Sequence, residues 1–212
     1  MLDIFSWGKH LVFQFEGFAL RVHFMLFGSF EATVKGKKVT GDYPRRNRVP
    51  RLALTFKNGH IEMYSCSLQY KELADAKANY DYAIDIMAPQ WDSKKAFQQT
   101  KNMTERQIGD LLLDQTLFSG VGNIIKNEVL FLVSTSPECT IRELSPAKLK
   151  KIIKTTRDFV FRFYEWRKNF ELKKHYQIYR KAVCTRCGTK VVKKKTGLGA
   201  RISYICPECQ TT

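Results

Sequence analysis

Apolar and polar residues alternate with a period of two in the first part of the chain. The alternating apolar positions are Leu11, Phe13 and Phe15 and, further on, Leu52, Leu54 and Phe56. Successive side chains of a strand point to opposite faces of a sheet, so this period predicts half-buried strands. Asn58-Gly59 and Gly36 follow or interrupt such stretches and predict hairpin turns. We therefore expect residues 1–87 to form a sandwich or barrel of antiparallel strands.

Helical spacing replaces this alternation after residue 87. Ser145-Pro146 places an N-cap residue before a proline at the first helical position. The helix that follows has an apolar side formed by Leu149, Ile152, Ile153, Phe159 and Phe163. Thr104-Glu105-Arg106-Gln107 fits a capping box in front of Ile108. We expect a helical domain over residues 88–175 and an α+β chain as a whole.

Four of the six cysteines form two Cys-x2-Cys knuckles, Cys184-Thr185-Arg186-Cys187 and Cys206-Pro207-Glu208-Cys209. The 18 residues between them match the spacing of a four-cysteine zinc site. These residues can pair as a β-hairpin with its turn at Gly197-Leu198-Gly199. Because all four ligands are thiolates, no coordination position is left for water. We expect one structural zinc ion and a zinc finger over residues 176–212.

Positive charge is concentrated in the C-terminal third of the chain. The sequence has 36 Lys and Arg against 20 Asp and Glu, a net charge of +16. Residues 148–201 hold 18 basic and 3 acidic residues, which is nearly all of the excess. A short charge run is usually only a solvated face, but this one is long and interrupted by aromatic residues. It predicts a folded basic region that attracts a polyanion such as nucleic acid.

A short glycine motif, Gly120-Val121-Gly122-Asn123, stands in front of a predicted helix. Asn123 is a favourable N-cap for that helix. Glycine lets a phosphate approach the backbone, and a helix N-terminus offers N–H donors and the positive end of the helix dipole. Glycine also occurs at such junctions for steric reasons alone. The motif therefore points to phosphate binding only in combination with the zinc knuckles and the basic charge.

Taken together, these motifs resemble the formamidopyrimidine-DNA glycosylase and endonuclease VIII family over nearly all 212 residues. Three stretches carry the resemblance: Gln115 to Phe131, Gln177-Ile178-Tyr179, and Arg201 with the following Cys206 to Gln210. The resemblance implies an antiparallel β-sandwich domain, a helix–two-turn–helix DNA-binding domain and a C-terminal zinc hairpin. It also implies base-excision repair of duplex DNA with damaged bases or abasic sites, by a DNA glycosylase with abasic-site lyase activity.

The resemblance implies DNA-binding roles for several residues. Arg201 falls where a zinc-finger arginine grips the phosphates that flank the damaged nucleotide. Asn123 falls where an asparagine beside Gly120 and Gly122 also contacts phosphate. Lys9 matches a β-domain lysine that holds the DNA near the lesion.

Two further positions concern the flipped base. Leu26 falls where a bulky apolar residue fills the gap in the stack, because such a side chain replaces the lost stacking. The segment from Ser65 to Tyr70 falls where relatives carry an arginine-rich loop that ends in an aromatic residue. Tyr70 retains the aromatic role, whereas Gln69 is a poorer partner for the orphaned base. The resemblance therefore leaves the preferred lesion open.

The N-terminus departs from the family pattern. In the family a proline amine at the start of the chain attacks the sugar and nearby glutamates transfer protons. Met1 aligns instead inside the β-domain, so we expect the domain to be incomplete and the chain to be inactive without that segment. Lys9 is the nearest substitute nucleophile, since Trp7 and Leu11 could lower its pKa by desolvation. Two alternatives are a non-catalytic DNA-binding module and an RNA-associated zinc-ribbon protein, which would leave the β-domain and the glycine junction unexplained.

The remaining features indicate the setting in which the protein works. The sequence has no apolar run of membrane-spanning length and no signal peptide at its start. We therefore expect a cytoplasmic monomer of bacterial type, associated with the nucleoid, without disulfides. Cys66 and Cys139 are expected in the core, and Glu128 is expected to be structural. The four histidines have no metal-ligand spacing; they are His10, His23, His60 and His175.

Overall fold

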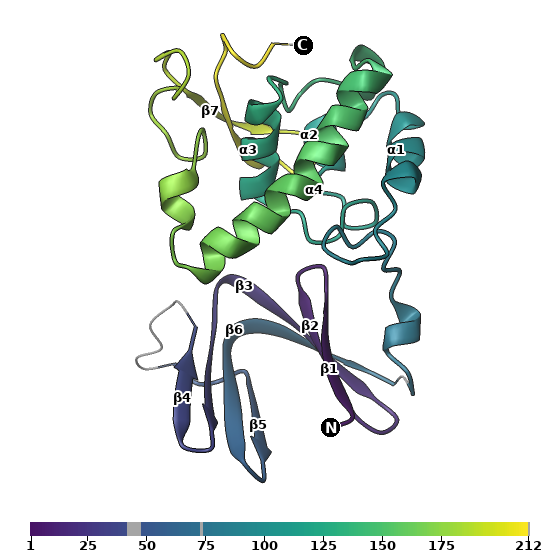
Figure 1. Ribbon diagram of the computed structural model, residues 1–212, viewed down its shortest axis with the longest axis vertical. Coiled ribbons are helices and arrows are strands. Elements are labelled where there is room, and N and C mark those ends of the chain that lie inside the picture. Colours follow the sequence, from purple (N-terminus) through teal and green to yellow (C-terminus); the bar gives the residue numbers. More distant parts are fainter. Residues whose placement is uncertain (42–47, 73, 212) are drawn as a thin grey trace. The chain divides into compact units, whose positions relative to one another are not determined.

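The computed structural model describes residues 1–41, 48–72 and 74–211, apart from the side chain of Leu26. The chain forms two compact units, Met1–Tyr80 and Asp81–Thr212, whose ribbons are drawn in Figure 1. The division into three domains at residues 87 and 175 stays a prediction.

The N-terminal unit is built on one six-stranded antiparallel sheet (Figure 1). The strands are β1 (Asp3–Trp7), β2 (His10–Gln14), β3 (Ala19–Val34), β4 (Lys37–Thr40), β5 (Leu52–Phe56) and β6 (Gly59–Lys71). Their order is β1-β2-β3-β6-β5, and β4 pairs with the end of β3. The antiparallel β-domain of the expected α+β fold is confirmed. A short 3-10 helix, η1 (Lys77–Asn79), follows the sheet.

Glycine has different functions in the two predicted hairpins. Lys35-Gly36 joins β3 to β4 with φ values of 49° and 78°, as a type I′ turn requires. Lys57-Asn58 joins β5 to β6, so Gly59 is the first residue of a strand and not part of the turn. A Cβ atom on Gly59 would lie 2.0 Å from the carbonyl oxygen of Thr33. Glycine is needed at position 59 because β3 approaches so closely.

Apolar side chains cover both faces of the sheet. Phe13 belongs to a cluster with Val22, Met63 and Cys66, and Cys66 is buried as expected. Val12, the preceding residue, points to the opposite face and is also fully buried. Alternation alone suggests one buried face and one exposed face. In this sheet, both faces carry buried apolar side chains.

The ladder between β3 and β6 is interrupted at residues 25–28. Phe24 and Ser29 are both paired with β6, but only Ser65 lies between their two partners. The additional residues of β3 therefore leave the ladder as a bulge. Leu26 lies in this bulge, and the residues on either side of it are both 55% exposed. The side chain of Leu26 itself lies outside the described residues.

The C-terminal unit is helical. Its helices are α1 (Ser93–Lys101), α2 (Ile108–Leu111), α3 (Asn123–Leu132) and α4 (Pro146–Lys168), with 3-10 turns η2 (Ile141–Glu143) and η3 (Leu172–His175). α1 and α3 both pack against α4. The predicted apolar side of α4 is confirmed, since Leu149, Ile152, Ile153 and Phe159 are buried and Phe163 is partly buried. Among the described residues, no helix has the length and apolar character of a membrane span.

The helix starts follow the sequence in one case and not in another. Ser145 caps α4 as expected, and its hydroxyl accepts a backbone N–H of the first turn. The capping box expected at Thr104 is wrong, because α2 begins only at Ile108 and has no side-chain cap. The Thr104 carbonyl accepts instead from Arg142, which fixes this segment in an irregular loop. A capping box does form at Thr140, at the start of η2.

Candidate zinc centre and nucleic-acid interface

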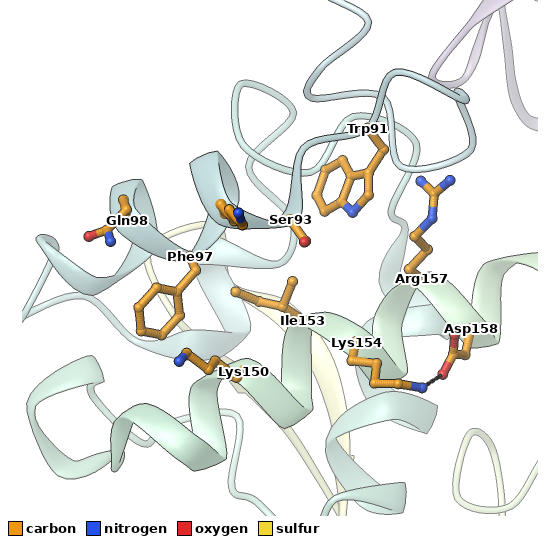
Figure 2. Close-up of a pocket in the computed structure, with 10 residues that line it drawn as sticks. Trp91, Ser93, Phe97, Gln98, Lys150, Ile153, Lys154, Arg157 and Asp158 are labelled. Carbon is orange, nitrogen blue, oxygen red and sulfur yellow. Dashed lines mark hydrogen bonds and ion pairs between the residues drawn. The ribbon is translucent and has the colours of Figure 1, made fainter.

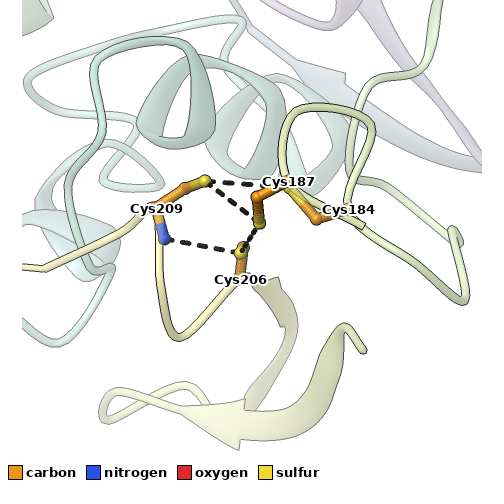
Figure 3. A group of neighbouring side chains, drawn as sticks. All are labelled: Cys184, Cys187, Cys206 and Cys209. Carbon is orange, nitrogen blue, oxygen red and sulfur yellow. Dashed lines mark hydrogen bonds between the residues drawn. The ribbon is translucent and has the colours of Figure 1, made fainter. Parts of the chain in front are cut away.

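Four thiols meet at the end of the C-terminal hairpin, which consists of β7 (Val192–Thr196) and β8 (Arg201–Ile205). The Sγ atoms of Cys184, Cys187, Cys206 and Cys209 all lie within 4.8 Å of one another (Figure 3). Tetrahedral zinc with Zn–S bonds of about 2.3 Å places its sulfurs about 3.8 Å apart. The thiols therefore fit the structural zinc ion expected from the sequence, with no position left for a reacting water.

The second knuckle is attached to the helical unit by Gln210, which is 4% exposed. Its Oε1 atom accepts from the Cys206 backbone N–H at 3.0 Å, and its Nε2 atom donates to the Thr135 carbonyl at 3.0 Å. Thr135 lies just beyond the end of α3. Sequence reasoning assigned no role to Gln210, although the residue directly follows the second cysteine knuckle.

Two asparagines of α3 hold strand β8. The Asn123 Nδ2 atom donates to the Ile202 carbonyl at 2.9 Å. One helical turn later, the Asn127 Oδ1 atom accepts from the Tyr204 backbone N–H at 2.7 Å. Ile202 directly follows Arg201, so the structure brings Asn123 next to the start of β8, where Arg201 lies.

A buried lysine lies at the centre of the same contact. Lys126 is 1% exposed, and its Nζ atom donates to the Ser203 hydroxyl at 2.7 Å. That hydroxyl is 2.6 Å from the Thr196 hydroxyl on β7. Burial lowers the pKa of Lys126 to about 8, while Asp110 acts to raise it and Arg201 to lower it. Lys126 thus links both strands of the hairpin to α3.

The pH dependence of stability should change in the Lys126→Met variant. The pKa of this lysine is about 8 in the folded chain, against 10.5 as its ordinary value, so the unfolded chain binds the proton more tightly. Neutral Lys126 therefore makes its full contribution to the free energy of unfolding above the unfolded pKa. This contribution is lost as the pH falls through 8. The wild-type minus variant difference in unfolding free energy should rise by on the order of 3 kcal/mol between neutral pH and the unfolded pKa. Urea denaturation of both zinc-loaded proteins measures this difference, and parallel pH curves would contradict the assignment.

Glu128 is fully buried on α3 and organises the segment before the first knuckle. Its carboxylate accepts the backbone N–H groups of Gln177, Ile178 and Tyr179 at 2.8, 3.1 and 2.8 Å. Burial raises the pKa of Glu128, and the three N–H donors oppose that shift. These contacts agree with the structural role expected for this residue.

The glycine junction leads directly into α3. Gly120 has a φ of 100°, in the left-handed region that favours glycine, and its N–H donates to the Gln115 side chain at 3.2 Å. Apart from its chain neighbours, no atom of the described residues lies within 4 Å of the position of a Cβ on Gly122, so the backbone is open there. Gly122 is the N-cap of α3. The expectation that Asn123 caps the helix is wrong, because its side chain binds Ile202 instead.

The tip of the hairpin is fixed on α2. Asp110 accepts the Leu198 backbone N–H at 2.8 Å. Gly197 has a φ of 70°, in the left-handed region that favours glycine, and a Cβ there would lie 1.9 Å from the same carboxylate. Arg201 follows as the first residue of β8, and its side chain is exposed. The docked tip therefore holds an exposed guanidinium near the glycine junction.

The other predicted DNA-binding residues belong to the N-terminal unit. Lys9 lies in the turn between β1 and β2 and is exposed, so Trp7 and Leu11 do not bury it. Tyr70 is 59% exposed and stacks on Phe18, with ring centroids 5.3 Å apart. The segment that ends at Tyr70 is part of strand β6 and not a loop.

Two histidines lie on the strands beside Lys9. His10 and His23 pair across β2 and β3, with ring centroids 5.1 Å apart. Burial lowers the pKa of His10 to about 4 and also lowers that of His23. Both rings are therefore neutral at neutral pH and pack within the sheet.

Cys139, on the other unit, is buried as expected.

Comparison with known proteins finds similarity to DNA glycosylases and endonucleases VIII. Residues 83–163 match the family model described as the formamidopyrimidine-DNA glycosylase H2TH domain. The chain is 32% identical over 206 residues to Endonuclease 8-like 3 of Xenopus laevis, covering 96% of the chain and 33% of that relative. It is 29% identical over 218 residues to Endonuclease 8 of Klebsiella pneumoniae, covering 96% of the chain and 80% of that relative. The chain thus spans about a third of the length of Endonuclease 8-like 3.

Solved structures share the fold. One is the Lactococcus lactis formamidopyrimidine DNA glycosylase bound non-covalently to DNA with an AP site, with a TM-score of 0.80 and 22% identity. The match covers 99% of this chain and 80% of that one. A viral DNA glycosylase gives a TM-score of 0.79, also at 22% identity, over 99% and 85% of the two chains. The similarity extends over both units of the chain.

Proposed function

Because the chain belongs to the formamidopyrimidine-DNA glycosylase and endonuclease VIII family, we propose that it recognises damaged bases or abasic sites in duplex DNA. Its place is in base-excision repair, as part of a DNA glycosylase with abasic-site lyase activity. One observation carries the proposal: Arg201, Asn123 and the open backbone at Gly122 lie together at the N-terminus of α3.

This surface has the chemistry of a phosphate site. The first turn of α3 has no side-chain cap, so its backbone N–H groups can donate to a phosphate oxygen. Arg201 adds an exposed guanidinium, which forms charge-assisted hydrogen bonds to phosphate. β7 adds two exposed lysines, Lys193 and Lys195, whereas Lys194 between them pairs with Glu138. A duplex bound here is held through its backbone, which fits a protein that must find a lesion in any sequence.

The N-terminal unit has the complementary role in the proposal. Leu26 fills the gap left by a flipped base, and Lys9 binds a phosphate near the lesion. The bulge supports the role of Leu26, because it carries the backbone of this residue out of the strand ladder. Tyr70 stacks beside the orphaned base through its exposed ring.

Catalysis is the finer part of the proposal. The family's lyase reaction uses a proline amine, and residues 1–212 offer the Met1 amine and lysine side chains in its place. We propose that these residues recognise the lesion and that a segment beginning with Pro-Glu is needed for cleavage. The second candidate function is a non-catalytic DNA-binding module with structural zinc, which the closed cysteine site and the phosphate surface equally support.

Duplex binding should depend on Arg201. Arg201→Ala should lose on the order of 1–3 kcal/mol of affinity, because it removes a charge-assisted contact to phosphate. The loss should be similar for any sequence, and the salt slope should flatten by about one unit. Asn123→Ala should weaken binding less, because its amide is uncharged. Fluorescence anisotropy with a labelled abasic duplex at several salt concentrations measures both effects.

Lys101→Ala is the matched control for this measurement. Lys101 is exposed at the end of α1, away from the junction, and carries the same charge. Its replacement should leave the affinity within a few tenths of a kcal/mol of wild type. Equal binding by the Arg201→Ala variant and wild type at all salt concentrations would show that the duplex binds elsewhere.

A further inference from the structure

A groove between α1 and α4 lies within the C-terminal unit (Figure 2). Its volume is about 770 Å³, within the range of roughly 300–1,000 Å³ typical of ligand sites. Trp91, Phe97 and Ile153 form its apolar lining. The spacing of the lining residues on both helices is that of one helix face, so the groove follows the direction of the helices.

Cationic side chains dominate the polar lining of this groove. Lys94, Lys150, Lys154 and Arg157 line it, against the single carboxylate of Asp158. Lys154 pairs with that carboxylate at 2.7 Å. The groove therefore presents an apolar strip bordered by positive charge, which complements an acidic ligand with an apolar part.

The indole of Trp91 provides a hydrogen-bond donor at the groove. Its Nε1 atom is buried and has no hydrogen-bond partner among the described residues. In Figure 2 this nitrogen lies on the side of the ring that faces Ile153 and Arg157. An unsatisfied buried donor costs about 1–3 kcal/mol, so a ligand that opens this nitrogen to the groove and supplies a carbonyl or carboxylate oxygen would gain from binding here.

The aromatic rings are not arranged to stack on nucleic-acid bases. The Lys150 ammonium lies over the Phe97 ring at 5.2 Å from its centroid. Trp91 packs against Phe118 in the core, with centroids 5.9 Å apart. Single-stranded nucleic acid is bound by bases that stack on free ring faces, whereas here Lys150 lies over the Phe97 ring and Phe118 packs against Trp91. In addition, α1 and α3 lie on different sides of α4 in Figure 1, so the groove is separate from the phosphate surface.

We propose that the groove between α1 and α4 binds an acidic segment of a partner protein, which inserts a bulky apolar side chain between the two helices. The apolar side chain contacts Phe97 and Ile153, and the acidic flanks face Lys94, Lys150 and Lys154. A backbone carbonyl or a carboxylate of the segment accepts from the Trp91 indole. This binding goes beyond DNA recognition and does not depend on it.

The Trp91 indole N–H also provides the test. The probe is a short peptide with a central Phe-Leu pair flanked by Asp and Glu, added to the ¹⁵N-labelled, zinc-loaded chain. The indole signal, assigned with Trp91→Phe, should shift on addition of the peptide. The double variant Lys150→Glu and Lys154→Glu should weaken binding by at least about tenfold, equivalent to 1.4 kcal/mol. The control Lys151→Glu and Lys168→Glu makes the same charge change on α4 outside the groove and should bind nearly as wild type.

Three further probes identify the kind of ligand. A peptide with Ser-Gly in place of Phe-Leu, and one with lysine flanks, should leave the Trp91 signal unchanged. An oligothymidylate should shift signals of α3 and β8 but not that of Trp91. Binding of all peptides regardless of charge, no binding of the acidic peptide, or displacement of that peptide by the oligothymidylate would each overturn the proposal. The last outcome would make the groove a nucleic-acid site instead.

Discussion

Replacement of Cys206 by serine is expected to unfold the β7–β8 hairpin and to reduce duplex affinity by about a hundredfold or more. Cys206 is fully buried among the four thiols, and a serine hydroxyl does not replace a thiolate ligand. Structural zinc is worth roughly 10–16 kcal/mol in finger peptides, so loss of the ion removes far more than one contact. The unfolded hairpin would no longer hold Arg201 beside α3, and the phosphate surface would lose its main cation.

Metal analysis, NMR spectra of the hairpin amides and anisotropy with an abasic duplex measure the three parts of this expectation. Cys139→Ala is the matched control, because Cys139 is also buried but lies outside the cysteine cluster. It should retain one zinc ion per chain and bind the duplex. Freshly purified wild-type protein without zinc, or a Cys206→Ser variant that binds normally, would show that the hairpin does not depend on metal.

Covalent trapping should separate recognition from chemistry. The proposed lyase reaction passes through an imine between an amine and the opened sugar, and borohydride reduction then links protein to DNA. An α-amino group has a lower ordinary pKa than a lysine side chain, so more of it is neutral and nucleophilic at working pH. The amine must also lie where the family's Pro-Glu segment places it, so residues 1–212 should bind an abasic duplex with little trapping. An extended chain that begins with Pro-Glu should be trapped efficiently and should cut the strand.

Lys9 is the decisive control for that experiment. The side chain is exposed, so it lacks the burial that could make a lysine a good nucleophile. Lys9→Ala should therefore weaken DNA binding without changing the trapped fraction per bound duplex. Rapid trapping of residues 1–212 that disappears in Lys9→Ala would instead identify Lys9 as the nucleophile. Trapping that survives in this variant would point to the Met1 amine or another lysine.

The features predicted correctly from the sequence depend on local chemistry. The two cysteine knuckles indicated a tetrahedral site because the ligand types and spacing are fixed by the ion itself. Ser145-Pro146 marked the start of α4 for a similar reason, since the cap is made by neighbouring residues. The hairpin at Gly36 followed from the positive φ that its turn requires.

The features that sequence reasoning missed depend on contacts between distant segments. Asn123 has the intrinsic preference of an N-cap, but a carbonyl 79 positions away binds its amide. Lys126 is normally an exposed residue type, and only the packing of β8 against α3 buries it. Gly59 appeared to be a turn residue, whereas the carbonyl of Thr33 explains it. No periodicity or local motif encodes such pairings.

The attachment of the hairpin to α3 affects its use as a transferable module. Four-cysteine hairpins are attractive parts for engineering because all four ligands of the metal lie within them. Here Asn127, Lys126 and Gln210 supply hydrogen bonds between the hairpin and the helical unit. A hairpin grafted onto another scaffold could still hold its ion, but it would carry unsatisfied polar groups and a tip without Asp110 to fix it. Transplantation of the arginine surface therefore requires α2 and α3 to be moved as well, and natural recombination of such chains faces the same constraint.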